Sequence, residues 1–218
     1  MHIQQTAEVV GPMGLEAMLS LPDKPHGLVV FAHGSGSSRL SPRNQHVAGA
    51  LQHRGFGTLL LDLLTADEGE DRDKVFDIAL LGQRVADAIA WACDDDRTRH
   101  LPIGLFGAST GAAAALVAAA REPVAVRAVV SRGGRPDLAA DVLALVKAPT
   151  LLIVGSLDDG VIGLNRSAMA RLTCGKRLEL VPGATHLFEE PGTLDRVVAL
   201  AAQWFVRHLP PVVARAAS

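Results

Sequence analysis

The sequence predicts an α/β fold, with a mostly parallel sheet of about seven to eight strands and helices on both faces. Short apolar runs typical of buried strands alternate with segments whose apolar residues recur at helical spacing. Short connections join these segments, so right-handed crossovers would place successive strands in one sheet. The 218 residues, 49% of them hydrophobic, are enough for one well-buried domain but too few for two comfortable ones.

The first half of the chain begins with an expected hairpin. Residues 4–10 and 15–21 flank Gly11-Pro12-Met13-Gly14, a pattern that predicts two antiparallel strands joined by a turn. The acidic stretch 65–73 lacks apolar periodicity, and we interpret it as a solvated loop rather than a site for a divalent metal. The other expected elements are strand 28–32, helix 44–54, strand 56–61 and one long amphipathic helix at 73–93.

The second half continues the alternation of strands and helices. The expected elements are strand 103–108, helix 112–121, strand 125–130, helix 138–146, strand 150–154, helix 164–172, strand 177–181 and helix 194–208. No segment between residues 130 and 150 is long enough for a cap domain. We expect residues 1–209 to form a single domain and residues 210–218 to form a flexible tail.

The strongest chemical signal is Gly107-Ala108-Ser109-Thr110-Gly111, between an apolar run and an Ala-rich segment. A serine at a sharp strand-to-helix turn is exposed to a base and lies beside free backbone N–H groups, which together make it a nucleophile. We therefore predict Ser109 as the nucleophile and the N–H of Thr110 as a donor to an oxyanion. The alternative is an ordinary tight turn between a strand and a helix.

Four expected strand ends carry polar residues. The segment 33–38 follows the first of these strand ends, Ser109 with Thr110 follows the second, Asp158 with Asp159 the third, and His186 the fourth. Ligands bind at the carboxyl ends of the strands in such sheets. We interpret His186 as the general base and Asp158 as the carboxylate that orients it, because Gly155 precedes Asp158 in a G-x-x-D spacing. The alternatives are Asp159 as the orienting group, or an aspartate that only caps a helix.

These motifs resemble those of the α/β-hydrolase superfamily, and most closely the small cap-less proteins of the dienelactone hydrolase type. The motifs are His33-Gly34-Ser35-Gly36, Gly107-Ala108-Ser109-Thr110-Gly111, Gly155-Ser156-Leu157-Asp158 and Gly183-Ala184-Thr185-His186. The resemblance covers about residues 7–208 and implies the α/β-hydrolase fold without a cap domain. It also implies a second oxyanion donor at the N–H of Ser35, and a loop-shaping role for His33. Dienelactone hydrolases proper carry a cysteine in place of Ser109, so a lactone substrate is less firmly implied than the fold and mechanism.

The expected activity is hydrolysis of small carboxylic esters, or of thioesters or lactones, through an acyl-enzyme. An acyltransferase or perhydrolase would use the same Ser109, Asp158 and His186. A non-catalytic protein of the same fold that binds a ligand or partner is the remaining alternative. The intact set of serine, aspartate and histidine argues against it, because a binding protein needs no such set.

Several arginines fall close to the expected site. Arg39, Arg43 and Asn44 follow the first strand-end loop, while Arg132 and Arg135 follow the strand after Ser109. Guanidinium groups on two facing loops would bind a carboxylate or phosphate of the substrate by paired hydrogen bonds. The alternative is that they are solvated surface charges.

Composition argues against other classes of protein. A formal net charge of -2, with basic and acidic residues interspersed, gives no footprint for nucleic acid or for an anionic membrane. The sequence shows no signal peptide and no apolar run of the roughly 18 residues that span a membrane. Cys93 and Cys174 lie in unrelated segments, as is typical of a reduced cytoplasmic protein. We expect a cytoplasmic monomer or homodimer that acts on a small acyl substrate.

Motifs for metals and cofactors are missing from the sequence. It contains no H-x-H, H-E-x-x-H or C-x-x-C pattern. The segment Gly34-Ser35-Gly36 does not extend to a dinucleotide-binding G-x-G-x-x-G, because Arg39 stands at the last position. We therefore expect no metal and no cofactor.

Overall fold

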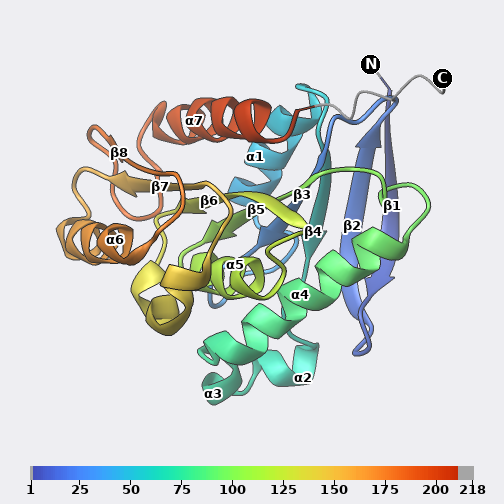
Figure 1. The fold of residues 1–218 in the computed structure, drawn as a ribbon, viewed down its shortest axis with the longest axis horizontal. Helices are drawn as coiled ribbons and strands as arrows, with labels where there is room; N and C mark the ends of the chain where they lie inside the picture. The colour runs from blue at the N-terminus through green and yellow to red at the C-terminus, as the bar shows by residue number, and fades with distance from the viewer. Residues whose placement is uncertain (1, 211–218) are drawn as a thin grey trace.

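The computed structural model describes residues 2–210 and contains an eight-stranded sheet (Figure 1). The strand order is β1-β2-β4-β3-β5-β6-β7-β8, in which β1 with β2 and β2 with β4 are antiparallel and all other neighbours are parallel. The strands are β1 (Ile3–Val10), β2 (Leu15–Pro22), β3 (Leu28–Ala32), β4 (Gly57–Leu61), β5 (Ile103–Ala108), β6 (Val126–Arg132), β7 (Thr150–Gly155) and β8 (Lys176–Val181). The predicted hairpin and mostly parallel sheet are confirmed.

Helices cover both faces of this sheet, as predicted. In Figure 1, α1 and α7 lie on one face, and α4, α5 and α6 lie on the other. The helices are α1 (Pro42–Gln52), α2 (Ala66–Gly69), α3 (Arg72–Val75), α4 (Ile78–Asp94), α5 (Thr110–Arg121), α6 (Asp159–Arg171) and α7 (Thr193–His208), with the 3₁₀ segment η1 (Pro136–Leu145). None of these helices has the length and apolar content that crossing a bilayer requires. Of the tail expected at 210–218, residues 211–218 lie outside the described residues.

The prediction of an acidic loop followed by one long helix is wrong. Residues 65–76 instead contain the two short helices α2 and α3, and α4 begins only at Ile78. Polar side chains explain these boundaries, because Thr65, Asp71 and Asp77 each accept a hydrogen bond from a backbone N–H at the start of the following helix. Thr65 and Glu68 form a reciprocal capping box.

Three boundaries in the second half also differ from the prediction. Strand β6 continues to Arg132, because its last residues pair with β5 on one side and β7 on the other. Helix α6 begins directly after Asp158, five residues before the expected start. The helix expected at 138–146 is the 3₁₀ segment η1, which is interrupted at Ala139. No cap domain is inserted in the described chain between β6 and β7.

The Ala-rich helix α5 is buried between β5, α4 and η1. Its residues Ala112 to Ala115 are fully buried, and the short alanine side chains allow the neighbouring layers to approach closely. Gly82 of α4 lies so near that a Cβ atom there would come within 2.5 Å of the Val117 side chain. Tight packing on every side therefore fixes the N-terminus of α5, where Ser109 lies.

Candidate active site

Ser109 occupies a strained turn between β5 and α5. Its backbone has φ 52° and ψ -121°, a conformation that costs a non-glycine residue about 1–3 kcal/mol. The strand and helix pass so close that a Cβ atom at Gly107 would lie 2.4 Å from Ala112 Cα. A Cβ atom at Gly111 would lie 2.3 Å from the carbonyl oxygens of Ala32 and His33. This close approach at both glycines holds the serine at the end of β5.

His186 and Asp158 are joined by a hydrogen bond of 2.7 Å between Nδ1 and Oδ2. The carboxylate only accepts, so Nδ1 carries the proton and Nε2 keeps a free lone pair, as a general base requires. Asp158 makes no side-chain cap to α6, so the structure does not support the helix-capping alternative for this residue. Asp159 lies in the first turn of α6, and Asp158 rather than Asp159 contacts the histidine.

The loops that carry these residues meet through their backbones. A Cβ atom at Gly155 would lie 2.3 Å from the carbonyl oxygen of Ala184, and one at Gly133 would lie 2.9 Å from that of His186. Phe188 supports the same loop in the left-handed conformation, with φ 56°, while its ring is 2% exposed. No local signal in the sequence marks a phenylalanine that adopts this conformation, so the role of Phe188 is visible only in the structure.

Ser109 and His186 line one cavity of about 240 Å³. Ser35, Arg43, Asn44 and Arg132 line it as well. Within residues 2–210 no hydrogen bond joins the Ser109 hydroxyl to His186. Such bonds are often long in ligand-free enzymes and shorten when substrate binds. The structure therefore brings the three predicted triad residues to one place.

The predicted oxyanion donors lie beside Ser109, with one contact that the sequence did not reveal. The N–H of Ser35 donates a hydrogen bond of 2.9 Å to the hydroxyl oxygen of Thr110. Its neighbour Gly34 lies against the nucleophile, since a Cβ atom there would be 3.0 Å from Ser109 Cβ. Thr110 is the first residue of α5, where backbone N–H groups lack partners within the helix. The Thr110 side chain thus ties the glycine-serine loop, residues 33–38, to the nucleophile turn.

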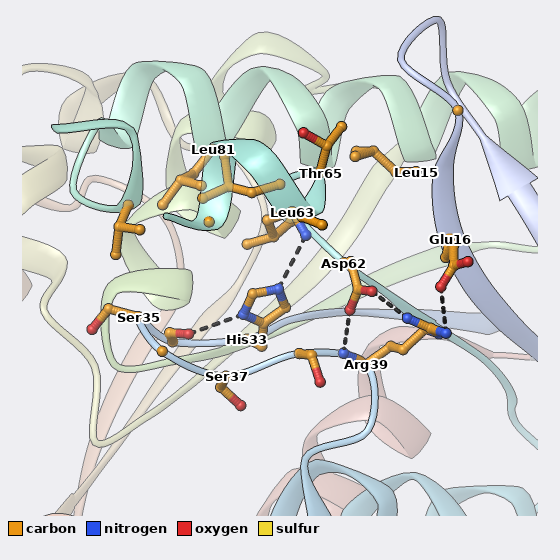
Figure 2. Close-up of a pocket in the computed structure, with 18 residues that line it drawn as sticks. Leu15, Glu16, His33, Ser35, Ser37, Arg39, Asp62, Leu63, Thr65 and Leu81 are labelled. Atoms are coloured by element: carbon orange, nitrogen blue, oxygen red, sulfur yellow. Dashed lines mark hydrogen bonds and ion pairs between the residues drawn. The ribbon is translucent and has the colours of Figure 1, made fainter. Parts of the chain in front are cut away.

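His33 shapes this loop, as predicted. Figure 2 shows its ring bridging two segments: Nε2 accepts a 3.0 Å hydrogen bond from the N–H of Leu63, and Nδ1 lies 2.9 Å from the carbonyl oxygen of Gly34. Because Nε2 accepts the hydrogen bond from Leu63, the ring proton lies on Nδ1, which donates to the carbonyl oxygen of Gly34. Burial lowers the pKa of His33, although the Gly34 bond and the charge of Asp62 act in the opposite direction. The neutral ring therefore fastens the end of β3 to the segment after β4.

We expect the free energy of unfolding to fall as the pH drops below about 6.5, the ordinary pKa of histidine, toward the lowered pKa of His33. In this window the unfolded chain binds the proton first, so acid favours unfolding by at most about 1.4 kcal/mol per pH unit. Urea titrations at several pH values would measure the slope.

His208 is the control for this prediction, because burial and then Arg207 lower its pKa as well. His33→Asn should flatten the slope more than His208→Asn does. An equal slope in wild type and His33→Asn would contradict the assignment.

A larger cavity of about 610 Å³, shown in Figure 2, is also lined by the glycine-serine loop. Both cavities are lined by Gly34, Ser35 and Ser37, which form the wall between them. Apolar side chains of the larger cavity come from β2, from the segment after β4, from α3 and from α4: Leu15, Leu63, Leu64, Val75 and Leu81. Ser109 therefore lines the smaller cavity, where polar side chains outnumber apolar ones, while the neighbouring cavity combines these apolar side chains with polar and charged ones.

The five expected substrate-binding residues separate into two groups. Arg43, Asn44 and Arg132 line the cavity with Ser109. Arg39 and Arg135 do not line this cavity. Arg39 lies at the larger cavity and pairs with Asp62 and Glu16, and Arg135 pairs with Asp137 at 2.8 Å.

Comparison with known proteins places this chain in a family. The family described as serine aminopeptidase, S33, matches residues 23–141. Two sequences from strains of Mycobacterium tuberculosis, which carry a provisional phosphoribosyl transferase name, are 57% identical over 206 residues. That match covers 94% of this chain and 46% of theirs, so the chain spans about half the length of these curated relatives.

Comparison with solved structures also indicates an α/β-hydrolase fold. The crystal structure of dienelactone hydrolase from Anabaena variabilis has 52% identity and a TM-score of 0.90, and the match covers 95% of this chain and 98% of that one. Est1E from Butyrivibrio proteoclasticus is only 16% identical, with a TM-score of 0.78 over 93% of this chain and 98% of its own, and it supports the fold alone. The chain belongs to the α/β-hydrolase superfamily, in the family described as serine aminopeptidase, S33, and its fold is that of a cap-less dienelactone hydrolase.

Proposed function

We propose that this protein is a serine hydrolase that cleaves small carboxylic esters through an acyl-enzyme on Ser109. The observation that carries the proposal is the 2.7 Å bond between His186 Nδ1 and Asp158, in a cavity that Ser109 also lines. A strained serine, a histidine with a free ring nitrogen and a partly buried carboxylate together form the arrangement used for acyl transfer.

In the proposed reaction, His186 Nε2 takes the proton of Ser109 while the hydroxyl oxygen attacks the ester carbonyl. Asp158 stabilises the imidazolium that forms, and its bond to Nδ1 keeps the ring oriented. His186 then protonates the departing alcohol, which leaves an acyl group on Ser109. Water, activated by the same histidine, attacks this acyl group, releases the acid and restores the free serine.

The N–H groups of Thr110 and Ser35 would stabilise the tetrahedral intermediate. In the free protein the N–H of Ser35 donates to the neutral Thr110 hydroxyl. A hydrogen bond to an ionised acceptor is roughly twice as strong as one to a neutral acceptor, so a full oxyanion competes successfully for this donor. The stabilisation would therefore be larger for the intermediate than for the ground-state ester, as catalysis requires.

The family description names an aminopeptidase, but the cavity favours another substrate. Recognition of a free amino terminus requires a carboxylate, whereas the described residues lining the cavity with Ser109 include two arginines and no acidic side chain. The phosphoribosyl transferase name belongs to proteins about twice as long as the matched region, so we do not transfer it to this chain.

Acyl transfer or perhydrolysis would use the same residues and differ only in the second nucleophile. The side chain of His186 is 37% exposed, which gives water direct access to the proposed acyl-enzyme and favours hydrolysis. A purely binding role explains the structure less well, because it gives no reason for the backbone strain at Ser109.

A fluorophosphonate probe tests the proposal, because it labels only an activated serine. We expect wild type to be labelled at Ser109, as located by peptide mass spectrometry, and His186→Ala to react far more slowly. Ser37→Ala is the matched control, since Ser37 lines the same cavity and should leave the labelling in place. A wild-type protein that resists the probe would exclude the proposed mechanism.

A further inference from the structure

Arg132 is a buried cation without an acidic partner. It is 6% exposed, and none of the ion pairs formed among residues 2–210 includes it. Arg84 provides the internal comparison: it is equally buried, at 7% exposed, but pairs with Glu68 at 3.1 Å. An isolated buried charge is costly in a protein interior. The two arginines therefore differ in whether the chain itself supplies the counter-charge.

The surroundings of Arg132 leave donors free. Its Nη2 donates to Asn44 Oδ1 at 3.5 Å, a long and weak contact, and its Nε has no partner among the described residues. The guanidinium carbon lies 5.9 Å from the centre of the Phe188 ring. These neighbours orient the group without neutralising it.

A second cation lines the same cavity. Burial, followed by the charge of Arg43, lowers the pKa of Arg132 to about 10, so the group still carries its charge at neutral pH. Arg43 pairs with Glu189 at 3.0 Å, but Glu189 is 63% exposed, and such surface pairs contribute little. The guanidinium groups of Arg43 and Arg132 thus line one cavity, and the carboxylate that pairs with Arg43, that of Glu189, is mostly exposed to solvent.

Backbone pairing places Arg132 beside the proposed nucleophile. It is the partner of Ala108 in the register of β5 and β6, and its carbonyl oxygen accepts a 3.2 Å hydrogen bond from the N–H of Ser109. Neighbouring strands lie about 4.8 Å apart, which is shorter than an extended arginine side chain. Because Arg132 and Ser109 also line the same cavity of about 240 Å³, a group bound by Arg132 would lie close to an acyl carbon at Ser109.

We propose that Arg132, together with Arg43 and Asn44, forms a subsite for an oxyanion group of the substrate, either a carboxylate or a phosphate. A planar guanidinium can donate two parallel hydrogen bonds to two oxygens of such a group. The amide of Asn44, which is 3% exposed, supplies a further donor at the same cavity. This inference rests on the proposed hydrolase function and specifies the kind of ester that the site prefers.

Kinetics test the subsite with three esters that share one leaving group and carry a carboxylate, a phosphate or a neutral isostere on the acyl side. We expect wild type to prefer one of the anionic esters over the neutral one by about ten- to a hundredfold in kcat/KM, the range of a charge-assisted hydrogen bond. Which anionic ester is preferred identifies the group. Arg132→Gln should bring the ratio of anionic to neutral kcat/KM toward one, and Arg132→Lys should recover only part of it.

Arg135→Gln is the matched control, because Arg135 follows the same strand but pairs with Asp137 outside the cavity. We expect this variant to retain the anionic preference. A wild type without any preference, or a preference that survives Arg132→Gln, would overturn the subsite even if neutral esters are hydrolysed.

Thermal unfolding tests binding without catalysis. At constant ionic strength, we expect inorganic phosphate or acetate to raise the Tm of wild type and of Ser109→Ala, and to raise it further, logarithmically, as the anion concentration exceeds its Kd. Neither should raise the Tm of Arg132→Met, which removes the charge while keeping most of the side-chain volume. A Tm shift that depends on Arg132, without hydrolysis of any ester, would support the subsite and contradict the hydrolase proposal. An equal shift in Arg132→Met would contradict the subsite.

Discussion

Ser109→Ala should lower the kcat of ester hydrolysis by about 10⁴- to 10⁶-fold, the loss expected when a triad nucleophile is removed. The Ser109 side chain makes no capping hydrogen bond to α5, so its removal should leave the fold and the Tm nearly unchanged. Steady-state kinetics with a chromogenic acetate ester, together with circular dichroism, would measure both effects.

The control for this variant is again Ser37→Ala, which removes a hydroxyl from the same cavity. We expect the kcat of Ser37→Ala to remain several orders of magnitude above that of Ser109→Ala. Turnover of folded Ser109→Ala within about tenfold of wild type would refute a nucleophilic role for this serine.

Asp158→Asn should lower kcat by about 10⁴-fold, because an amide beside Nδ1 no longer stabilises the imidazolium and can favour the wrong tautomer. Asp159→Asn is the matched control, one residue further along the chain. Asp159 lies in the first turn of α6, where an acidic group contributes about 0.3–1 kcal/mol to stability through the helix dipole.

The comparison requires kcat and Tm for both variants. We expect Asp158→Asn to lose activity while its Tm changes little, and Asp159→Asn to lose some stability while it keeps most of its activity. If the two variants lose equal activity, or if Asp159→Asn loses more, the bond between His186 and Asp158 is not the catalytic one.

The buried strands β3, β5 and β7 could be predicted closely because each is an apolar run with glycine or proline close to its ends. The starts of the helices were harder to predict. Helix α6 begins at Asp159, although Gly160 and Gly163 weaken the local helical pattern, because packing against η1 and β7 overrides propensity. The short helices α2 and α3 depend on single capping side chains such as Thr65, which periodicity does not reveal.

The order of Ser109, Asp158 and His186 could be predicted from the sequence because each residue follows a recognisable strand end. The arginines could not be sorted in this way. Arg39 pairs with Asp62, 23 residues away, so only the tertiary structure reveals that its charge is already compensated. Arg132 resembles it in the sequence but meets no acid in the described fold. Sequence spacing indicates which strand end a side chain follows, whereas charge compensation depends on distant partners.

The backbone contacts between loops also constrain how this site can diversify. At Gly111, Gly133 and Gly155 an added Cβ atom would come within 3 Å of a carbonyl oxygen of a neighbouring loop, so these positions are closed to any side chain. Leu187 adjoins His186, lines the same cavity and is 39% exposed, so its side chain can change in size without disturbing those contacts. Mutational libraries aimed at new substrates should therefore vary Leu187 and keep the three glycines constant.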